Sequence, residues 1–317
     1  MYNKNMKNKK SLLSIVMVNR NAPQVTIDAL QSIEKSYPEE VANGTYEVSL
    51  VDNGSRDGSQ EILKSYAKKT TIKKFHLTLN PVGLGFSRGN NAGLPQTDGE
   101  YVLFLNNDTI VNENVFPYMI NFMKNHSNAG AATCKLIMRN GKIDDATHRG
   151  FPTPWNSFCH FSGLAKIFPG TKLFGSYNMT YVKEMEKTHE IDALAGAFMI
   201  MPRWVGEKVG WWDGDFFLYG EDLDFCYRIK KAGLKIYYVP EVSTIHLKGA
   251  TMGIRKESQD ITKAQLQDKI ESQNARFDSM KIFYNKHYKN KYPKIITSIV
   301  MMQIEAMRNK NLKKYTV

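Results

Sequence analysis

The 317-residue sequence contains few cysteines and no long hydrophobic run. Cys134, Cys159 and Cys226 lie far apart and form no CxxC or zinc spacing, so we expect free thiols in a reducing cytoplasm. No stretch approaches the ~18 apolar residues that a membrane span needs. The basic N-terminal stretch leads into the short run "SLLSIVMV" with no small-residue cleavage site, which predicts a first β-strand instead of a signal peptide. A cytoplasmic protein that is soluble or peripheral to the membrane is therefore expected.

Acidic residues are fewer than basic ones, 31 against 43, which gives a formal net charge of +12. Such an excess suggests a polyanionic partner: nucleic acid, an anionic membrane surface or a phosphorylated substrate. Much of it is terminal, in "NKNMKNKK" and in the lysines after Tyr284, and solvated tails explain it equally well. A basic nucleic-acid-binding module is the alternative from a different class. No recognised motif supports it, and the lysines do not interleave with aromatic residues.

Two phosphate-binding signatures are missing. The chain has no Walker A sequence. The stretch "GLGFSRGNN" has the spacing G-x-G-x-x-x-G and follows the third predicted strand, whereas a dinucleotide fingerprint is G-x-G-x-x-G after the first. A Rossmann cofactor site is therefore excluded.

Strands and helices alternate over the first hundred residues. Such alternation predicts βαβ units with a parallel sheet, whose ligand loops should follow Asn19, Asp52, Asn80 and Asn106 at one edge. The predicted strands are "LLSIVMVN", "YEVSLVDN", "IKKFHLTLN" and "EYVLFLNND", and the predicted helices are "QVTIDALQSI", "SQEILKSYAKK" and "FSRGNNAGL".

The pattern loosens after Asn112. Residues 150–190 are rich in aromatics, Gly and Pro and predict a long functional loop region. From about Ser258 to the end of the sequence we expect helices. Before residues 150–190 we expect a helix in "ENVFPYMINFMKN" and a strand "GAATCKLIM" that turns at Asn140-Gly141. After them we expect a strand "IDALAGAFMIMP", a helix "EDLDFCYRIKKAG" closed by Gly233, and a strand "LKIYYVP".

The four predicted strand ends all carry polar, ligand-capable residues. Any one of these groups is more typical of a turn or a helix N-cap than of a site. Four of them at one sheet edge are what a nucleotide cleft requires. The groups are Asn19-Arg20, Asp52-Asn53-Gly54-Ser55, Gly83 to Asn91, and Asn107-Asp108.

Acidic residues also open the helix in "GEDLDFCYRIKKAG". Asp222 shares a helix face with the apolar residues that should turn inward, which gives a carboxylate there a reason to act as a catalytic base. Asp224 stands four residues before Arg228 and predicts an ordinary surface ion pair. We therefore assign Asp222 as the candidate base and Glu221 as its helper or orienting residue. His246, just after a predicted strand, is a candidate to share a divalent ion with Asp108.

Five motifs occur in an order that resembles family 2 inverting glycosyltransferases of the GT-A fold, closest to the rhamnosyltransferase-like branch. The resemblance spans roughly residues 11 to 250. It implies an α/β fold with a mostly parallel central sheet and flanking helices, followed by a C-terminal helical extension. The motifs are "SIVMVNRN", "VDNGSRDGS", "NPVGLGFSRGNNAGL", "FLNNDT" and "GEDLDFCYR…H".

The resemblance implies a role for individual residues. Asp108 matches the last carboxylate of the family's D-x-D metal motif, whose first carboxylate is replaced by Asn106. His246 matches a histidine that completes the metal shell, and Asp222 matches the general base. The implied nucleotide-binding residues are Asn19, Arg20, Asp52, Asn53, Arg88, Asn91 and Asn107, and the acceptor candidates are Trp155, His160, Trp211 and Trp212, of which the last two could equally be core residues.

The implied activity is a metal-dependent transfer, with Mg²⁺ or Mn²⁺, of a sugar from dTDP-rhamnose or a UDP-sugar. The acceptor would be a saccharide or lipid-linked saccharide in cell-surface polysaccharide synthesis. Asp52 and Asn53 would read a pyrimidine edge that uridine and thymidine share, so both bases stay open. A sugar nucleotidylyltransferase of similar fold is the runner-up, but those enzymes open with a G-x-G-T-R-type loop where this chain has "VNRNAPQ".

We predict a glycosyltransferase domain over residues 1–250, with a nucleotide-binding half at 11–112 and an acceptor half at 113–250, and a helical extension over 251–317. In the tail, Ile296, Ile299, Val300 and Met307 recur at helical spacing between lysines. Two alternatives stay open for it. It packs on the domain or on a second copy, or it lies as an interfacial helix on the inner face of the plasma membrane.

Overall fold

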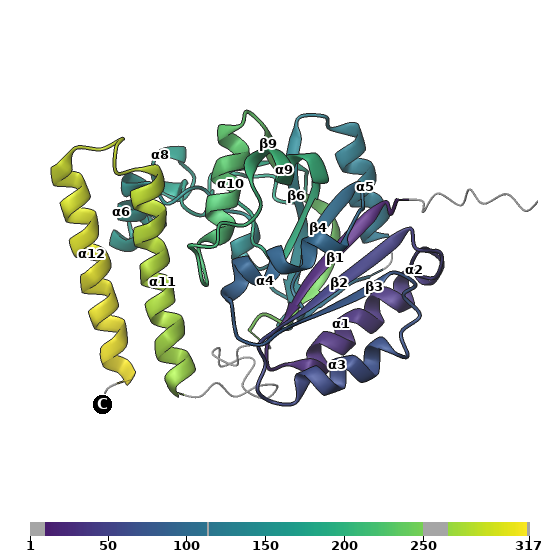
Figure 1. The fold of residues 1–317 in the computed structure, drawn as a ribbon. Helices are drawn as coiled ribbons and strands as arrows, with labels where there is room; N and C mark the ends of the chain where they lie inside the picture. The colour runs from purple at the N-terminus through teal and green to yellow at the C-terminus, as the bar shows by residue number, and fades with distance from the viewer. Residues whose placement is uncertain (1–9, 113, 250–265, 316–317) are drawn as a thin grey trace, which may run out of the picture.

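The computed structural model describes residues 10–112, 114–249 and 266–315. It shows one mixed sheet covered by helices, with two long C-terminal helices standing beside it (Figure 1). The strand order is β3-β2-β1-β4-β8-β6-β9-β5, and β7 pairs with β9 off this path. The predicted α/β class is confirmed.

The first half contains the four predicted strands and the three predicted helices. β1 pairs in parallel with β2 on one side and with β4 on the other, and β2 pairs in parallel with β3. A short helix, α2, is additional. The elements are β1 (Leu13–Asn19), α1 (Pro23–Ser36), α2 (Pro38–Asn43), β2 (Tyr46–Asn53), α3 (Ser59–Ala67), β3 (Phe75–Asn80), α4 (Gly85–Gly93) and β4 (Tyr101–Leu105).

The second half adds antiparallel pairing. β8 runs antiparallel to both β4 and β6, while β6 and β9 are parallel. The predicted turn at Asn140-Gly141 and the helix end at Gly233 are confirmed by positive φ angles at both glycines. The elements are β5 (Thr109–Ile110), α5 (Val115–Asn125), β6 (Ala129–Met138), β7 (His189–Ile191), β8 (Phe198–Pro202), α9 (Arg203–Val209), α10 (Glu221–Lys231) and β9 (Lys235–His246).

Two predictions for the second half were wrong. The single strand expected in "IDALAGAFMIMP" is divided into β7 and β8, because the chain between them turns aside and pairs Ala193 with Arg149. The region 150–190 is more than a loop. It contains α6 (Pro154–Ser162), which Thr153 caps by accepting a hydrogen bond from the Asn156 N–H (3.1 Å), and the short helices α7 (Leu164–Ile167) and α8 (Lys172–Gly175).

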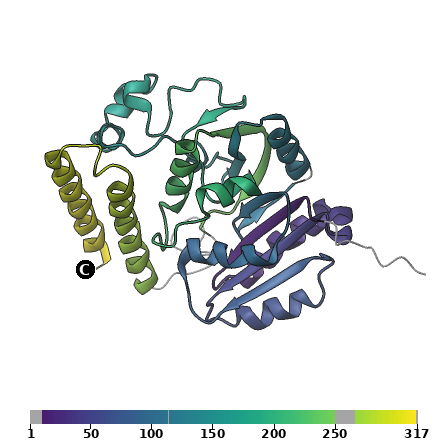
Figure 2. The same ribbon diagram turned by 45° about the horizontal axis from the view of Figure 1, so that its top comes forward.

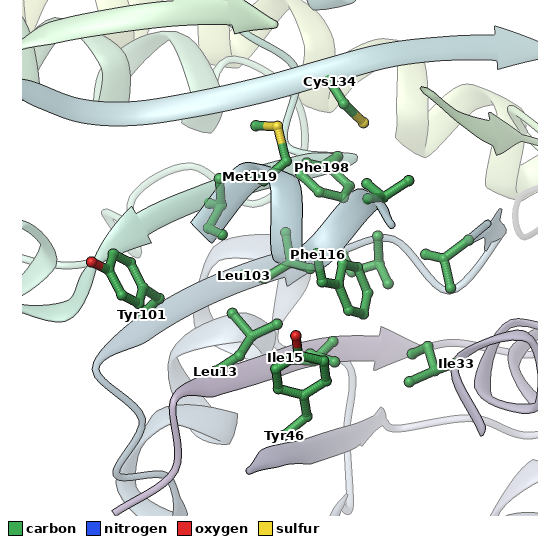
Figure 3. Close-up of a cluster of buried hydrophobic side chains, with 14 of the residues drawn as sticks. Leu13, Ile15, Ile33, Tyr46, Tyr101, Leu103, Phe116, Met119, Cys134 and Phe198 are labelled. Carbon is green, nitrogen blue, oxygen red and sulfur yellow. The ribbon is translucent and has the colours of Figure 1, made fainter. Parts of the chain in front are cut away.

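The core lies on both faces of the sheet because side chains alternate along each strand. On β1, Leu13, Ile15 and Met17 face one cluster, which α1 and α5 cover. Figure 3 shows part of this cluster, with Phe116 of α5 close to Tyr46 of β2. Val16 faces the other cluster, which includes Phe104 and Phe225 of α10. This two-sided burial explains the near-continuous apolar sequence of the strands.

Of the C-terminal helices α11 (Leu266–His287) and α12 (Lys294–Leu312), α11 packs against both α10 and α12, and its contacts correct the prediction for Asp224. Its ion pair with Arg228 exists (2.7 Å), but the carboxylate is fully buried instead of lying on the surface. His287 Nε2 (2.7 Å) and Lys286 Nζ (2.8 Å) from α11 reach its other oxygen. A buried hydrophobic cluster lies next to this contact between α10 and α11 and consists of Phe216, Phe283, Tyr284 and Tyr288.

The predicted boundary between residues 250 and 251, and the start of the tail helices near Ser258, lie outside the described residues. On α12, Val300 contacts the cluster just described and Ile304 is buried, so part of the predicted apolar stripe packs inward. No helix within the described ranges is long and apolar enough to cross a membrane.

We predict that Asp224→Asn lowers the free energy of unfolding by about 3–5 kcal/mol at neutral pH, because it leaves buried cations without their counter-charge. Burial alone would raise the pKa of Asp224, but the hydrogen bond from His287 and the charge of Arg228 lower it to about 2. Its contribution is therefore present above pH ~4, the ordinary carboxyl pKa, and is lost as the pH falls toward 2.

Urea unfolding of the wild type and of Asp224→Asn at neutral and acidic pH would measure this difference. Asp278→Asn is the matched control, since Asp278 pairs with Arg308 while 55% of its side chain is exposed. Exposed pairs contribute only about 0–1 kcal/mol. Equal effects of the two substitutions would contradict a buried role for Asp224.

Candidate functional site

A chain of buried hydrogen bonds joins the ends of β1, β2 and β4. Asn19 Nδ2 donates to Asp52 Oδ1 (2.7 Å), and Thr26 Oγ1 donates to Asn19 Oδ1 (2.8 Å). Asn107 Nδ2 in turn donates to Thr26 Oγ1 (2.8 Å). The predicted meeting of these strand ends at one sheet edge is confirmed.

Asp52 and Asn53, predicted to read the base, are themselves buried and hydrogen-bonded within the protein. Asp52 accepts from Ser55 and from Gln60 Nε2 (3.0 Å). Asn53 Nδ2 donates to Gly85 O (2.9 Å), and its Oδ1 accepts from the Leu84 N–H (2.9 Å). Asp52 therefore holds the loop after β2 and the start of α3, and Asn53 holds the start of α4. A direct contact of either residue with a base stays a prediction.

The two predicted nucleotide-binding arginines are exposed at this edge. The guanidinium of Arg20 lies so close to Gly83 that a Cβ there would come within 1.7 Å of Nη1. Arg88 Nε donates to Gly214 O (3.1 Å). Asn91, in contrast, uses both ends of its amide on the main chain of Trp212 (2.7 and 3.1 Å), and so holds the segment before α10.

Asp108 and His246, predicted to share a metal ion, lie side by side and are buried. Asp108 Oδ1 is 3.2 Å from His246 Nε2, and its Oδ2 accepts from the Gly249 N–H (3.2 Å). Burial alone would lower the pKa of His246, but the charge of Asp108 and its hydrogen bond raise it to about 9. The same pairing keeps the pKa of Asp108 below its usual value despite burial.

Asp144 is a third member of this group that the sequence did not predict. Its buried carboxylate accepts from His246 Nδ1 (3.1 Å) and pairs with Lys248. It stands 102 residues from His246 in the chain. No motif spacing links such distant positions. The only local signal was its place just after the Asn140-Gly141 turn.

These residues fit a divalent cation that also binds diphosphate. A histidine that binds a metal through one ring nitrogen usually donates from the other to a carboxylate, which is the arrangement of His246 and Asp144. Within the described part of the chain, no three His, Cys, Asp or Glu side chains are arranged to hold a metal alone. Mg²⁺ typically takes one or two carboxylates and completes its shell with phosphate oxygens and water. Asp108 supplies the carboxylate of that pattern, and His246 would add a ring nitrogen, a ligand better suited to Mn²⁺ than to Mg²⁺.

The second group of charges lies at the start of α10. Asp222 Oδ2 forms an ion pair with Arg149 and Oδ1 accepts from the Leu223 N–H (2.8 Å), while 14% of the side chain is exposed. Burial, with the neighbouring charge of Asp222, raises the pKa of Glu221 to about 8. Glu221 is therefore neutral at pH 7, and Asp222, which pairs with Arg149, is the partly exposed carboxylate beside it.

Arg149 was not predicted from the sequence. Burial alone would lower its pKa, but Asp222 raises it. Its Nη2 also donates to Leu194 O (3.3 Å), so it ties α10 to the chain between β7 and β8. A single arginine in an irregular segment carries no sequence pattern that would have revealed this role.

The acceptor candidates divide into two sets. Trp212 is a core residue, packed against Phe104 and Phe225 at 5.0 Å, so its proposed stacking on a sugar is wrong. Trp211 also packs on Phe104, at 6.2 Å. Trp155 and His160 lie on α6, where Trp155 is 46% exposed and His160 stacks on Tyr177 at 4.2 Å.

The base candidate and the nucleotide loop are tied together by the main chain. The Phe86 N–H of α4 donates to Phe217 O (2.7 Å), four residues before Glu221. Gly85 permits this approach, because its φ is +80° and a Cβ would lie 2.5 Å from the same carbonyl oxygen. The start of α10 is thereby fixed beside the polar edge of the sheet.

Comparison with known proteins shows the family to which the chain belongs. Residues 14–189, more than half of the chain, match the profile of glycosyl transferase family 2. The chain belongs to that family. Curated relatives include the poly-beta-1,6-N-acetyl-D-glucosamine synthase of Staphylococcus epidermidis, 24% identical over 76% of this chain and 51% of the relative. The rhamnosyltransferase WbbL of Escherichia coli K12 is 28% identical over 51% of this chain and 60% of the relative.

Solved structures show the same fold for this family 2 glycosyltransferase. The mannosyltransferase PcManGT of Pyrobaculum calidifontis, in complex with GDP-Man and Mn²⁺, superposes with a TM-score of 0.56 at 14% identity, covering 95% of this chain and 70% of that one. TarS of S. aureus in complex with UDP-GlcNAc gives a TM-score of 0.53 at 16% identity, covering 93% and 71%. The predicted GT-A-like fold is confirmed.

We predict that Asp144→Asn weakens Mn²⁺ binding about 10–100-fold, the usual cost of losing a carboxylate behind a metal-binding histidine. Mn²⁺ titration followed by electron paramagnetic resonance would measure it. Asp145→Asn is the matched control, because Asp145 is the neighbouring residue and is exposed. Unchanged affinity in Asp144→Asn, or equal weakening in both variants, would contradict the role of Asp144.

Proposed function

We propose that this enzyme transfers a sugar from a nucleotide-diphosphate donor to an acceptor hydroxyl with inversion at the anomeric carbon. The observation that carries the proposal is the pair of charged groups at one sheet edge. Asp108 with His246 fits a metal-diphosphate, and Asp222 offers a partly exposed carboxylate paired with Arg149. Two such groups are what a single displacement requires, one on the leaving-group side and one on the acceptor side.

In the proposed reaction the acceptor oxygen attacks the anomeric carbon on the face opposite the diphosphate. The new C–O bond forms while the bond to the diphosphate oxygen breaks, and that oxygen keeps the electron pair. Asp222 takes the acceptor proton. A bound Mg²⁺ or Mn²⁺ would neutralise charge on the departing diphosphate.

The residues around Asp222 support this assignment. Arg149 occupies only one of its oxygens and Leu223 N–H contacts the other, so lone pairs remain for a substrate proton. Glu221, whose pKa is raised to about 8, is protonated at pH 7 and cannot compete as the base. Its Oε2 has no hydrogen-bond partner among the described residues.

For the donor we propose a UDP- or dTDP-sugar, dTDP-rhamnose included. The similarity to a rhamnosyltransferase and to a UDP-GlcNAc complex supports these two classes. For the acceptor we propose a saccharide or lipid-linked saccharide in cell-surface polysaccharide synthesis. The names of the two curated relatives, a polysaccharide synthase and a rhamnosyltransferase, support this acceptor class. The chain spans 51–60% of the lengths of these relatives.

We predict that Asp222→Asn lowers kcat by roughly 10²–10⁴-fold with little change in donor binding, because the amide keeps the shape of the side chain but cannot accept the proton. Transfer rates and donor Kd values for the two proteins would test this. Asp215→Asn is the control, since Asp215 is exposed and lies seven residues earlier. Near-normal transfer by folded Asp222→Asn would exclude Asp222 as the base.

We also predict that one class of nucleotide-sugar raises the melting temperature only when Mn²⁺ is present, and that Asp108→Ala abolishes this increase. A thermal-shift panel of UDP-, dTDP- and GDP-sugars, with and without Mn²⁺, would identify the donor class. Metal-independent stabilisation that survives in Asp108→Ala would contradict the proposed metal site.

A further inference from the structure

The segment containing α6, α7 and α8 carries an exposed apolar surface to which the proposed reaction assigns no role beyond that of the acceptor candidate Trp155. Six large apolar side chains on it, which we call the aromatic patch, are 46–67% exposed. Monomeric proteins rarely leave so many large apolar side chains together in water without a binding purpose. The patch consists of Trp155, Phe158, Phe161, Ile167, Phe168 and Leu173.

Hydrogen bonds and ring contacts within the segment hold the aromatic patch in a defined arrangement. The Gly150 N–H donates to Tyr177 O (3.0 Å), which closes the base of the segment. Trp155 Nε1 donates to Leu173 O (2.8 Å) and thus ties α6 to α8. Phe168 packs against Phe174 at 5.2 Å. Both views show the segment standing off the sheet, beside the connection between α11 and α12 (Figures 1 and 2).

The charge around the patch points to an anionic partner. Residues 150–182 contain no Asp or Glu, while Lys166 and Lys172 are both exposed within them. A second copy of the chain seated on the same patch would bring these lysines against their own counterparts, which disfavours self-association. Aromatic rings flanked by lysines match the boundary between lipid headgroups and acyl chains.

We propose that the aromatic patch docks on the surface of an anionic lipid bilayer. The patch is rooted at Gly150, next to Arg149, which pairs with Asp222. Docking of the patch on a bilayer would therefore bring the start of α10 close to the saccharide headgroup of a lipid-linked acceptor. The proposal puts the contact on α6–α8, and the exposed side chains Ile295, Ile299 and Met302 of α12 serve as the comparison surface. The inference does not depend on the identity of the donor or on the assignment of the base.

The first test is sedimentation of the full chain with vesicles of phosphatidylcholine alone, or mixed with an equal amount of phosphatidylglycerol. We expect binding to the mixed vesicles only, weakened by salt. Phe161→Ser combined with Phe168→Ser should reduce it at least tenfold, and Lys166→Gln and Lys172→Gln about fivefold each. The matched control, Ile295→Ser combined with Met302→Ser on α12, should stay within twofold of the wild type.

The second test follows tryptophan fluorescence during vesicle addition. We expect a blue shift that Trp155→Phe removes and Trp204→Phe retains, since Trp204 is similarly exposed, at 45%, but lies on α9. Absence of vesicle binding by folded wild type would overturn the proposal. So would equal loss in the α12 variant, or a dimer in solution that the Phe161 and Phe168 substitutions convert to a monomer.

Discussion

The placement of the site depends on the position of β1 between β2 and β4. Because β1 pairs with β2 on one side and with β4 on the other, the strand order reverses here, and open α/β sheets bind ligands at the carboxyl ends of the strands at such a point. The buried chain from Asp52 through Asn19 and Thr26 to Asn107 bridges this point. The polar strand ends are therefore fixed relative to one another before any ligand arrives.

A second constraint is that buried charges need partners. Asp224 has Arg228, Lys286 and His287, and Asp144 has His246 and Lys248. A buried carboxylate without such a partner takes up a proton, as Glu221 does because burial and Asp222 raise its pKa. Asp222, adjacent in sequence, differs from Glu221 in its contacts, because it has Arg149 as an ion-pair partner. That partner stands 73 residues away in the chain.

The local elements were predictable because their signals are local. Apolar runs ending in Asn or Asp marked the parallel strands, and a glycine at Gly233 marked the end of α10. The pairing of Asp108 with His246 also followed, through motifs whose order resembles a known family. The prediction of a single strand over β7 and β8 was wrong because a continuous apolar run has no periodicity that marks where a strand ends. The prediction of a surface position for Asp224 was wrong because α11 packs over a helix face that the sequence pattern left exposed.

The sequence by itself determined the α/β class, the polar sheet edge and the identity of Asp108, His246 and Asp222 as candidates. Only the tertiary structure decided what surrounds them. Asp144 and Arg149 lie far from their partners along the chain, and Trp212 belongs to the core because Phe104 and Phe225 close around it. The physical reason is that hydrogen bonds and ion pairs of high sequence separation leave no periodic trace in the sequence, since their geometry exists only once the layers have packed.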